Sequence, residues 1–204
     1  MPTWLGRVLL VLLGSVAWAR PAAAGWPPPP QSDGVYGRLD GDTDLSLKLG
    51  GQLGQGGWAG SVGLSAHYYS ILGITADYCD SLDAESKYAR SFSAGPEIRP
   101  LFLPRFALGL ERGPAWLDLV LDSVSLGFGA YFSEARSAGG DTQGVWFSAG
   151  LGLPLLGHAA GPWIEARALR RLADLGPSGS EGHDALFMYL SWHHWVQLGP
   201  LTNH

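Results

Sequence analysis

Charged residues and cysteine are both scarce in this chain. Only 15% of its 204 residues are Asp, Glu, Lys or Arg, compared with about 25% in a typical soluble domain. The formal net charge of −5 offers no basic surface, which excludes a nucleic-acid partner of the usual kind. The one cysteine excludes an internal disulfide framework and a thiolate zinc site. We therefore expect no metal site, no cofactor and no nucleic acid.

Long apolar runs are also missing from most of the chain. No stretch after residue 24 reaches the roughly 18 uninterrupted apolar residues that indicate a membrane-spanning helix. Near the start, Arg7 precedes a mostly apolar stretch at 8–19 and a run of alanines, which predicts a cleaved secretory signal over residues 1–24. That stretch is shorter than the ~20 residues of a spanning helix, which disfavours a transmembrane anchor.

The chain is instead rich in glycine and alternates between apolar and polar residues from Val35 onward. A period of two is the pattern of a β-strand with two different faces. The alternation defines eight spans, at 44–53, 58–68, 72–79, 92–99, 124–132, 145–155, 164–171 and 186–193. The apolar positions that define these spans carry no charge. Arg170 has the same parity in the seventh span, but it lies just beyond the last apolar position there. The opposite positions carry eight charges, on Asp44, Lys48, Asp77, Glu97, Arg99, Glu165, Arg167 and Arg171.

Alternation by itself fits two kinds of barrel. A soluble barrel or sandwich turns its charged face to water, whereas a membrane barrel turns it into the lumen. Here glycine and serine crowd the charged face, which suits a narrow interior. The eight charges also sum to zero, as expected of a paired network that fills the lumen and leaves no open pore. We therefore predict that the charged face points inward.

Aromatic residues lie toward the ends of the spans, where membrane barrels carry interfacial girdles. The predicted interfacial aromatics are Trp58, Tyr68, Tyr78, Phe92, Phe132, Phe147 and Trp192.

The connections between spans alternate between short and long, as in outer-membrane barrels with short periplasmic turns and long external loops. The segment Leu101–Asp122 breaks this rule because it is long and partly apolar. It predicts either an amphipathic segment at the membrane surface or two further strands, and we favour eight strands over ten. Three prolines, at 96, 100 and 154, should lie at bulges or strand ends because proline cannot donate a ladder hydrogen bond.

These features resemble the small eight-stranded outer-membrane β-barrels of Gram-negative bacteria over roughly residues 35–198. The predicted fold is all-β, an antiparallel up-and-down transmembrane barrel. A proline-rich linker at 25–34 would precede it and a tail at 199–204 would follow it. The resemblance implies a monomer in the outer membrane, with membrane lipid, periplasmic chaperones and the barrel-insertion machinery as partners. Such barrels usually end on an aromatic residue, and here further residues follow the aromatic segment Trp192–Trp195.

Three functions remain open at this point. The first is a non-enzymatic barrel with a structural or loop-displaying role. The second is a lipid-modifying hydrolase or acyltransferase, because Ser191 and His193 share a face and resemble the Ser/His pairs of such barrels, with Glu165 or Glu97 as the orienting acid. The third is a soluble periplasmic barrel that binds an apolar ligand.

His193 and His194 point to opposite faces and so do not share a metal ion, and Cys79 is expected to be a small lumen filler.

Overall fold

The computed structural model describes residues 36–54, 57–83, 86, 88–111, 113–136, 140–174 and 184–198. The predicted signal, linker and tail lie outside these residues, so those three assignments stay predictions.

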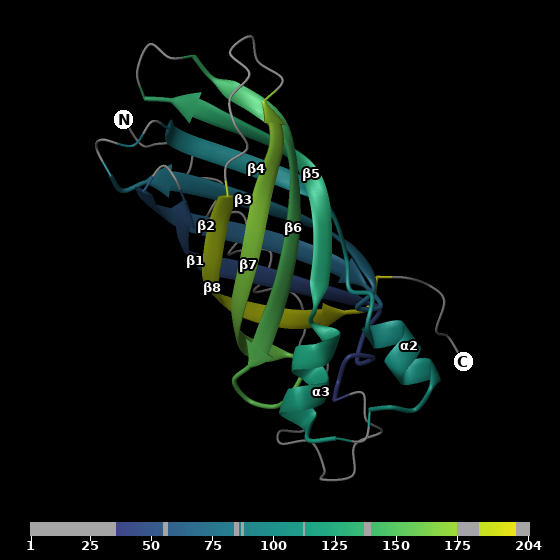
Figure 1. Ribbon diagram of the computed structural model, residues 1–204. Coiled ribbons are helices and arrows are strands. Elements are labelled where there is room, and N and C mark those ends of the chain that lie inside the picture. Colours follow the sequence, from purple (N-terminus) through teal and green to yellow (C-terminus); the bar gives the residue numbers. More distant parts are fainter. Residues whose placement is uncertain are drawn as a thin grey trace.

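Eight antiparallel strands form a closed barrel in which each strand pairs with its neighbours in the sequence and the last strand pairs with the first (Figure 1). The prediction of an eight-stranded up-and-down barrel is confirmed. The strands are β1 (Thr43–Gly54), β2 (Gly57–Tyr68), β3 (Leu72–Ser81), β4 (Tyr88–Ile98), β5 (Ser125–Ala135), β6 (Thr142–Pro154), β7 (Gly161–Asp174) and β8 (Asp184–Val196).

The alternative with ten strands is wrong. The segment Leu101–Asp122 forms two short helices, α2 (Phe102–Ala107) and α3 (Ala115–Asp122). Pro104 lies in the first turn of α2 and Pro114 immediately precedes α3. Both positions are favourable for proline in a helix, whereas a central strand would lose a ladder hydrogen bond at each. No helix in the described ranges has the length and apolar content to cross a membrane.

The apolar face of the sheet points outward. Ile74, Phe128 and Leu190 are between 56% and 66% exposed although each lies within a strand. Residues of the opposite parity, such as Asp44 and Asp77, are 1% exposed inside the barrel. Because the closed sheet has no free edge, its backbone polar groups are satisfied within the barrel. An apolar outer band around a polar interior is the architecture of a transmembrane β-barrel.

The two ends of the barrel differ (Figure 1). One end carries α2, α3 and the connections at 69–71 and 155–160, and we call it the helix end. Because the strand number is even, β1 starts and β8 finishes at this same end. The opposite end, the loop end, carries the remaining four connections.

Two of the three prolines take the positions expected of them, whereas Pro96 lies at neither a bulge nor a strand end. Pro154 is the last residue of β6, and Pro100 follows the end of β4. Pro96 lies inside β4, where the pairing with β5 runs from Ala94 directly to Glu97. The ladder is therefore interrupted where the proline lacks a donor.

Glycines make room for the largest side chain inside the barrel. Trp146 on β6 is fully buried and donates a hydrogen bond from its indole nitrogen to the carbonyl oxygen of Ala130, at 2.9 Å. A Cβ atom on Gly129 would lie 2.7 Å from the Trp146 ring and 2.2 Å from the carbonyl oxygen of Ala94. Backbone atoms cannot move aside as a flexible side chain can, so this position requires glycine.

We predict that Gly129→Ala lowers the free energy of unfolding by about 1–3 kcal/mol through overpacking. Gly60 on β2 is the matched control, because a Cβ there would meet no atom within 4 Å. Gly60→Ala should leave stability unchanged or raise it slightly, since glycine in a strand carries an entropic cost. Urea unfolding midpoints in lipid vesicles measure both variants, and equal midpoints would contradict the tight packing at Gly129.

Candidate functional site

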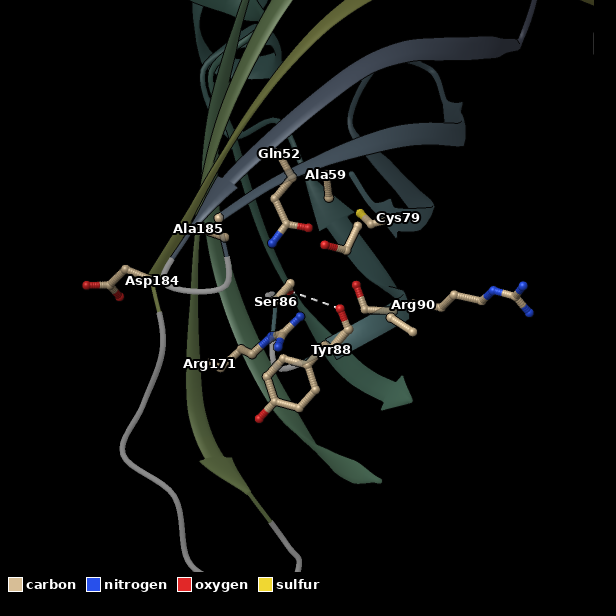
Figure 2. Close-up of a pocket in the computed structure, with 14 residues that line it drawn as sticks. Gln52, Ala59, Cys79, Ser86, Tyr88, Arg90, Arg171, Asp184 and Ala185 are labelled. Carbon is tan, nitrogen blue, oxygen red and sulfur yellow. Dashed lines mark hydrogen bonds between the residues drawn. The ribbon is translucent and has the colours of Figure 1, made fainter. Parts of the chain in front are cut away.

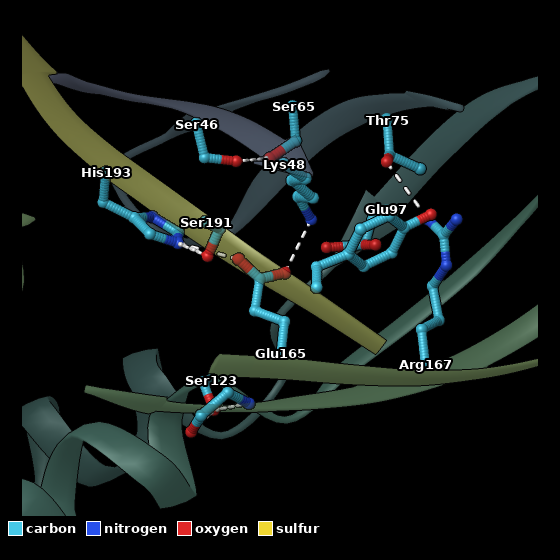
Figure 3. Close-up of polar contacts among 12 residues, drawn as sticks. Ser46, Lys48, Ser65, Thr75, Glu97, Ser123, Glu165, Arg167, Ser191 and His193 are labelled. Atoms are coloured by element: carbon cyan, nitrogen blue, oxygen red, sulfur yellow. Dashed lines mark hydrogen bonds and ion pairs between the residues drawn. The ribbon is translucent and has the colours of Figure 1, made fainter. Parts of the chain in front are cut away.

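Charged side chains from β1, β7 and β8 (Lys48, Glu165 and His193 in Figure 3) meet Arg99, which lies just past the end of β4, in the helix-end half of the lumen. Lys48 on β1 contacts Glu165 on β7, with Nζ and Oε2 2.7 Å apart. The other oxygen of Glu165 lies 2.8 Å from Nε2 of His193 on β8. Asp44 on β1 lies 3.0 Å from Nδ1 of His193 and 3.0 Å from a guanidinium nitrogen of Arg99. These five side chains form one continuous chain of alternating charge.

A second group lies further toward the loop end. Arg167 on β7 pairs with Asp77 on β3 and donates a hydrogen bond to Thr75 at 3.2 Å. The hydroxyl of Tyr189 donates to the second oxygen of Asp77 at 2.7 Å. The guanidinium of Arg167 also lies over the Phe187 ring, 4.9 Å from its centre. Asp77 therefore has both oxygens satisfied although it is almost completely buried.

Glu97 on β4 has a partner that the sequence analysis overlooked. Its carboxylate lies 2.9 Å from Nε2 of His67 on β2, and His67 is fully buried. His67 and Tyr189 both lie on the polar parity of their strands, which was the signal that could have identified them. The two same-strand combinations, Glu97 with Arg99 and Glu165 with Arg167, do not form direct ion pairs, because each member contacts a different strand.

Of the eight charged residues predicted to face the lumen, seven contact an oppositely charged or protonatable side chain from another strand. Arg171 is the exception within the described residues. Its guanidinium lies over the rings of Tyr131 and Tyr88, at 4.4 and 5.9 Å from their centres. Cys79 is buried, forms no disulfide bond, and lies with Arg171 near the loop end of the barrel.

We predict that Glu165→Ala lowers the free energy of unfolding by about 3–5 kcal/mol. The substitution removes the carboxylate that Lys48 and His193 both contact, so their charges stay buried with less compensation. Asp141, an exposed residue that accepts a hydrogen bond from the Ala135 amide, is the control, and Asp141→Ala should cost about 0.5 kcal/mol or less. Urea unfolding of both variants in lipid vesicles measures the two losses of stability. Similar midpoints would mean that Glu165 does not carry a buried charge pair.

A separate ionic cluster closes the helix end. Arg38 contacts Glu111 at 2.6 Å and Asp122 at 2.7 Å. Arg105 of α2 contacts Asp122 at 2.8 Å and also pairs with Asp118 of α3. The cluster ties the segment before β1 to both helices, and we call it the cap cluster.

The cap cluster and the helices α2 and α3 together form what we call the cap, and apolar packing holds it against the barrel. Leu119 of α3 packs with Trp163 of β7 and Trp195 of β8, and all three are buried. Ser123, which follows α3, exchanges two hydrogen bonds with the backbone of Gly152 on β6, at 2.7 and 3.0 Å. The cap is therefore joined to the barrel wall as well as to its own helices.

The cap cluster holds three carboxylates and two arginines close together. Burial and the neighbouring Asp122 carboxylate raise the pKa of Glu111 to about 7. A raised pKa means that the folded cap binds a proton that the unfolded chain releases. The stabilisation is thus fully present below the usual pKa of a glutamate and is lost as the pH rises through about 7.

We predict that the cap loosens as the pH is raised from about 5 to 8, and that Glu111→Gln removes most of this dependence because a neutral amide replaces the titrating carboxyl. Amide hydrogen exchange of residues 102–122 at matched chemical exchange rates measures the change. The strands serve as an internal reference. A cap whose protection rises with pH in the unaltered protein would show that the sign is wrong.

Ser191, His193 and Asp44 lie in the order of a catalytic triad. Ser191 Oγ lies 3.4 Å from Nε2 of His193, and Asp44 faces the other ring nitrogen. However, Glu165 also contacts Nε2, at 2.8 Å, so carboxylates face both nitrogens of the ring. Only a protonated ring has a donor for each of them, and a protonated ring cannot act as a base toward serine. The cavity beside His193 measures about 20 Å³, room for about one water molecule.

The predicted interfacial aromatics all lie on the outer parity. Tyr78, Phe92 and Phe132 are paired neighbours across β3, β4 and β5 and form a row. Trp58 lies near the loop end of β2, whereas Tyr68 and Trp192 lie toward the helix end. Phe147 lies near the middle of β6 and Phe92 near the middle of β4, so their placement at strand ends is wrong. The reason is that β6 begins at Thr142 and β4 at Tyr88, both earlier than the alternation indicated.

Among the described residues, no group of three His, Cys, Asp or Glu side chains is arranged to hold a metal ion. The comparisons with known proteins add little. No family model matches the chain, and no curated protein matches it.

Among solved structures, the chain is similar to Ail, the attachment invasion locus protein of Yersinia pestis, at 15% identity and a TM-score of 0.41, over 76% of this chain and 99% of that one. Ail in complex with the heparin analogue sucrose octasulfate matches at 14% identity and a TM-score of 0.39, over 75% and 97%. Neisserial surface protein A matches at 12% identity and a TM-score of 0.39, over 76% and 96%. Similarities this low carry no argument about function.

Proposed function

We propose that this protein is an outer-membrane β-barrel with a structural or loop-displaying role, that its lumen is filled by the charge network, and that it does not form an open pore. The observation that carries the proposal is the inversion of the barrel, with apolar side chains outside and charged side chains inside. We further propose that it is a monomer, delivered by a cleaved signal, periplasmic chaperones and the barrel-insertion machinery.

The outer surface supports membrane insertion. Large apolar side chains cover every strand, and the most exposed within the strands include Ile74 at 66% and Trp58 at 62%. A soluble protein rarely exposes a continuous apolar surface of this extent. The same observation opposes the soluble ligand-binding barrel, which would need its apolar face in the interior.

The interior supports a filled lumen. An eight-stranded barrel is just wide enough for its own side chains. Cavities of about 20 Å³ lie on either side of His193 in the helix-end half, and each has room for about one water molecule. The cap cluster and α3 cover the same end. These features oppose a continuous aqueous path through the described part of the barrel.

The lipid-modifying enzyme is the second candidate, and it is favoured by one observation, the sequence of contacts from Ser191 through His193 to Asp44. The occupied Nε2 and the absence of substrate room at the described site oppose it. Ser191 and His193 are 2% and 3% exposed, and both lie on the side of the sheet away from lipid. We therefore propose a role for these residues in holding the interior together.

We predict that Leu190→Arg, in the middle of β8 on the outer face, lowers folding stability in lipid vesicles by about 2–4 kcal/mol, because it places a charge in the hydrocarbon layer. Leu82 lies just past β3 at the loop end, and Leu82→Arg is the control, with an expected cost of about 1 kcal/mol or less.

The same vesicles test the lumen, because a filled barrel should not carry a steady ionic current across a planar bilayer made from them. A Leu190→Arg variant as stable as the control would argue against membrane insertion. A stepwise current through the unaltered protein would contradict the filled lumen alone.

A further inference from the structure

The loop end of the barrel contains a cavity of about 230 Å³, about ten times the volume of each cavity near His193 (Figure 2). Residues near the ends of six strands line it, so it lies at the loop end of the barrel. Its lining is mixed: glycines and small apolar residues such as Ala59 and Ala185 alternate with the neutral polar side chains of Gln52, Ser81 and Ser91.

Arg171 supplies the positive charge of this cavity. Its guanidinium lies beside Ser86 and above the Tyr88 ring in Figure 2, and 4.4 Å from the centre of the Tyr131 ring. Its Nε atom is buried and has no hydrogen-bond partner among the described residues. No carboxylate in the described part of the chain pairs with this guanidinium.

The Nε atoms of Arg99, Arg105 and Arg167 also have no hydrogen-bond partner among the described residues, so the missing carboxylate is what distinguishes Arg171 from the other interior arginines. Arg167, four residues earlier on the same face of β7, pairs with Asp77. Arg99 pairs with Asp44 inside the barrel, and Arg38 and Arg105 pair with carboxylates in the cap. Enclosing a guanidinium without an opposite charge is costly, and this protein avoids that cost at every other such position that the structure describes.

Two further charged residues border the cavity, but their side chains point away from it. Asp184 and Arg90 extend outward in Figure 2, and both are more than half exposed, at 71% and 52%. Each has a distant partner on the outer surface, 3.8 Å away for Asp184 and 3.9 Å for Arg90. The charge that faces the cavity is therefore positive.

We propose that this cavity binds an oxyanion, the carboxylate, sulfate or phosphate group of a ligand that enters from the loop end, and that Arg171 is the residue that binds it. A guanidinium presents its donors as a planar fork that matches two oxygens of such a group. The rings of Tyr131 and Tyr88 fix the plane of the fork, and the neutral polar lining offers further hydrogen bonds without repelling the anion. The site lies at the opposite end of the lumen from the cap and does not depend on the barrel being structural.

The test follows the Nε–H NMR signal of Arg171 in the full-length protein in detergent micelles. Sodium phosphate, sulfate and acetate are titrated separately, with chloride lowered to keep the ionic strength constant. A saturable shift with at least one of the three anions is expected. A second arm replaces the soluble anion with micelles that contain phosphatidylglycerol, which separates a lipid phosphate from a free one.

Arg171→Gln should weaken the binding of the responding anion by about tenfold or more, because a charge-assisted hydrogen bond is lost. Arg171→Lys, which keeps the charge but not the fork, should lie between. Arg170→Gln is the matched control, since this neighbouring arginine is 68% exposed on the outer face, and it should leave affinity within about twofold.

Signals that respond to no anion, or that respond equally in Arg171→Gln, would overturn the proposal. It would also be overturned if Glu85→Gln, Asp174→Asn or Glu181→Gln shifts the Arg171 signal and creates anion binding, because an internal carboxylate would then be the partner. Since the first measurement uses the unaltered protein, it does not depend on the variants folding. Membrane insertion is measured separately at Leu190, so the two proposals can fail independently.

Discussion

Ion pairing across a narrow lumen is the constraint on which this barrel depends. An eight-stranded barrel has room inside for side chains and little water, so each charge that points inward must meet an opposite charge or a protonatable partner. Lys48 with Glu165 joins β1 to β7, Asp44 with Arg99 joins β1 to the helix-end extension of β4, and Asp77 with Arg167 joins β3 to β7. None of these strand pairs shares a ladder of backbone hydrogen bonds. The ion pairs therefore fix the cross-section of the barrel, which neighbouring ladders alone leave adjustable.

The small residues follow from the same constraint. Long charged side chains and Trp146 point into the interior, and many of the inward positions around them are glycine or serine. Gly63 illustrates this, because a Cβ there would lie 2.6 Å from a carboxylate oxygen of Asp77. The unusual composition of the chain, rich in glycine and poor in charge, thus reflects a barrel whose inward face carries the charges and small residues and whose outward face is apolar.

The interior changes in character along the barrel axis. The helix end is closed by the cap cluster and by the packing of Leu119 with Trp163 and Trp195. Ion pairs cross the helix-end half and the middle of the lumen, and the loop end holds a cavity that, among the described residues, one positive charge faces.

Much of the site could be predicted because side-chain parity is local. Seven of the eight charged residues predicted to face the lumen lie on the inward face of a strand, and the eighth, Arg99, lies just past the end of β4. The polar parity also contained His67 and Tyr189, which were not recognised as partners. The strand ends were predicted less well, as Phe147 shows, because Gly, Ser and Thr dilute the alternation there. The helices at 102–107 and 115–122 were ambiguous as well, since a partly apolar segment with two prolines fits more than one local structure.

The sequence by itself determined that the strands have two faces and that the charged face is the crowded one, and it favoured eight strands over ten. These properties depend only on neighbouring residues, because successive side chains of a strand point to opposite sides. Only the tertiary structure decided which acid meets which base, that Glu97 contacts His67 and not Arg99, and that Arg171 has no carboxylate partner among the described residues. Contacts across the lumen depend on the register of every strand around the barrel, and a shift of two residues at any one ladder would change them all.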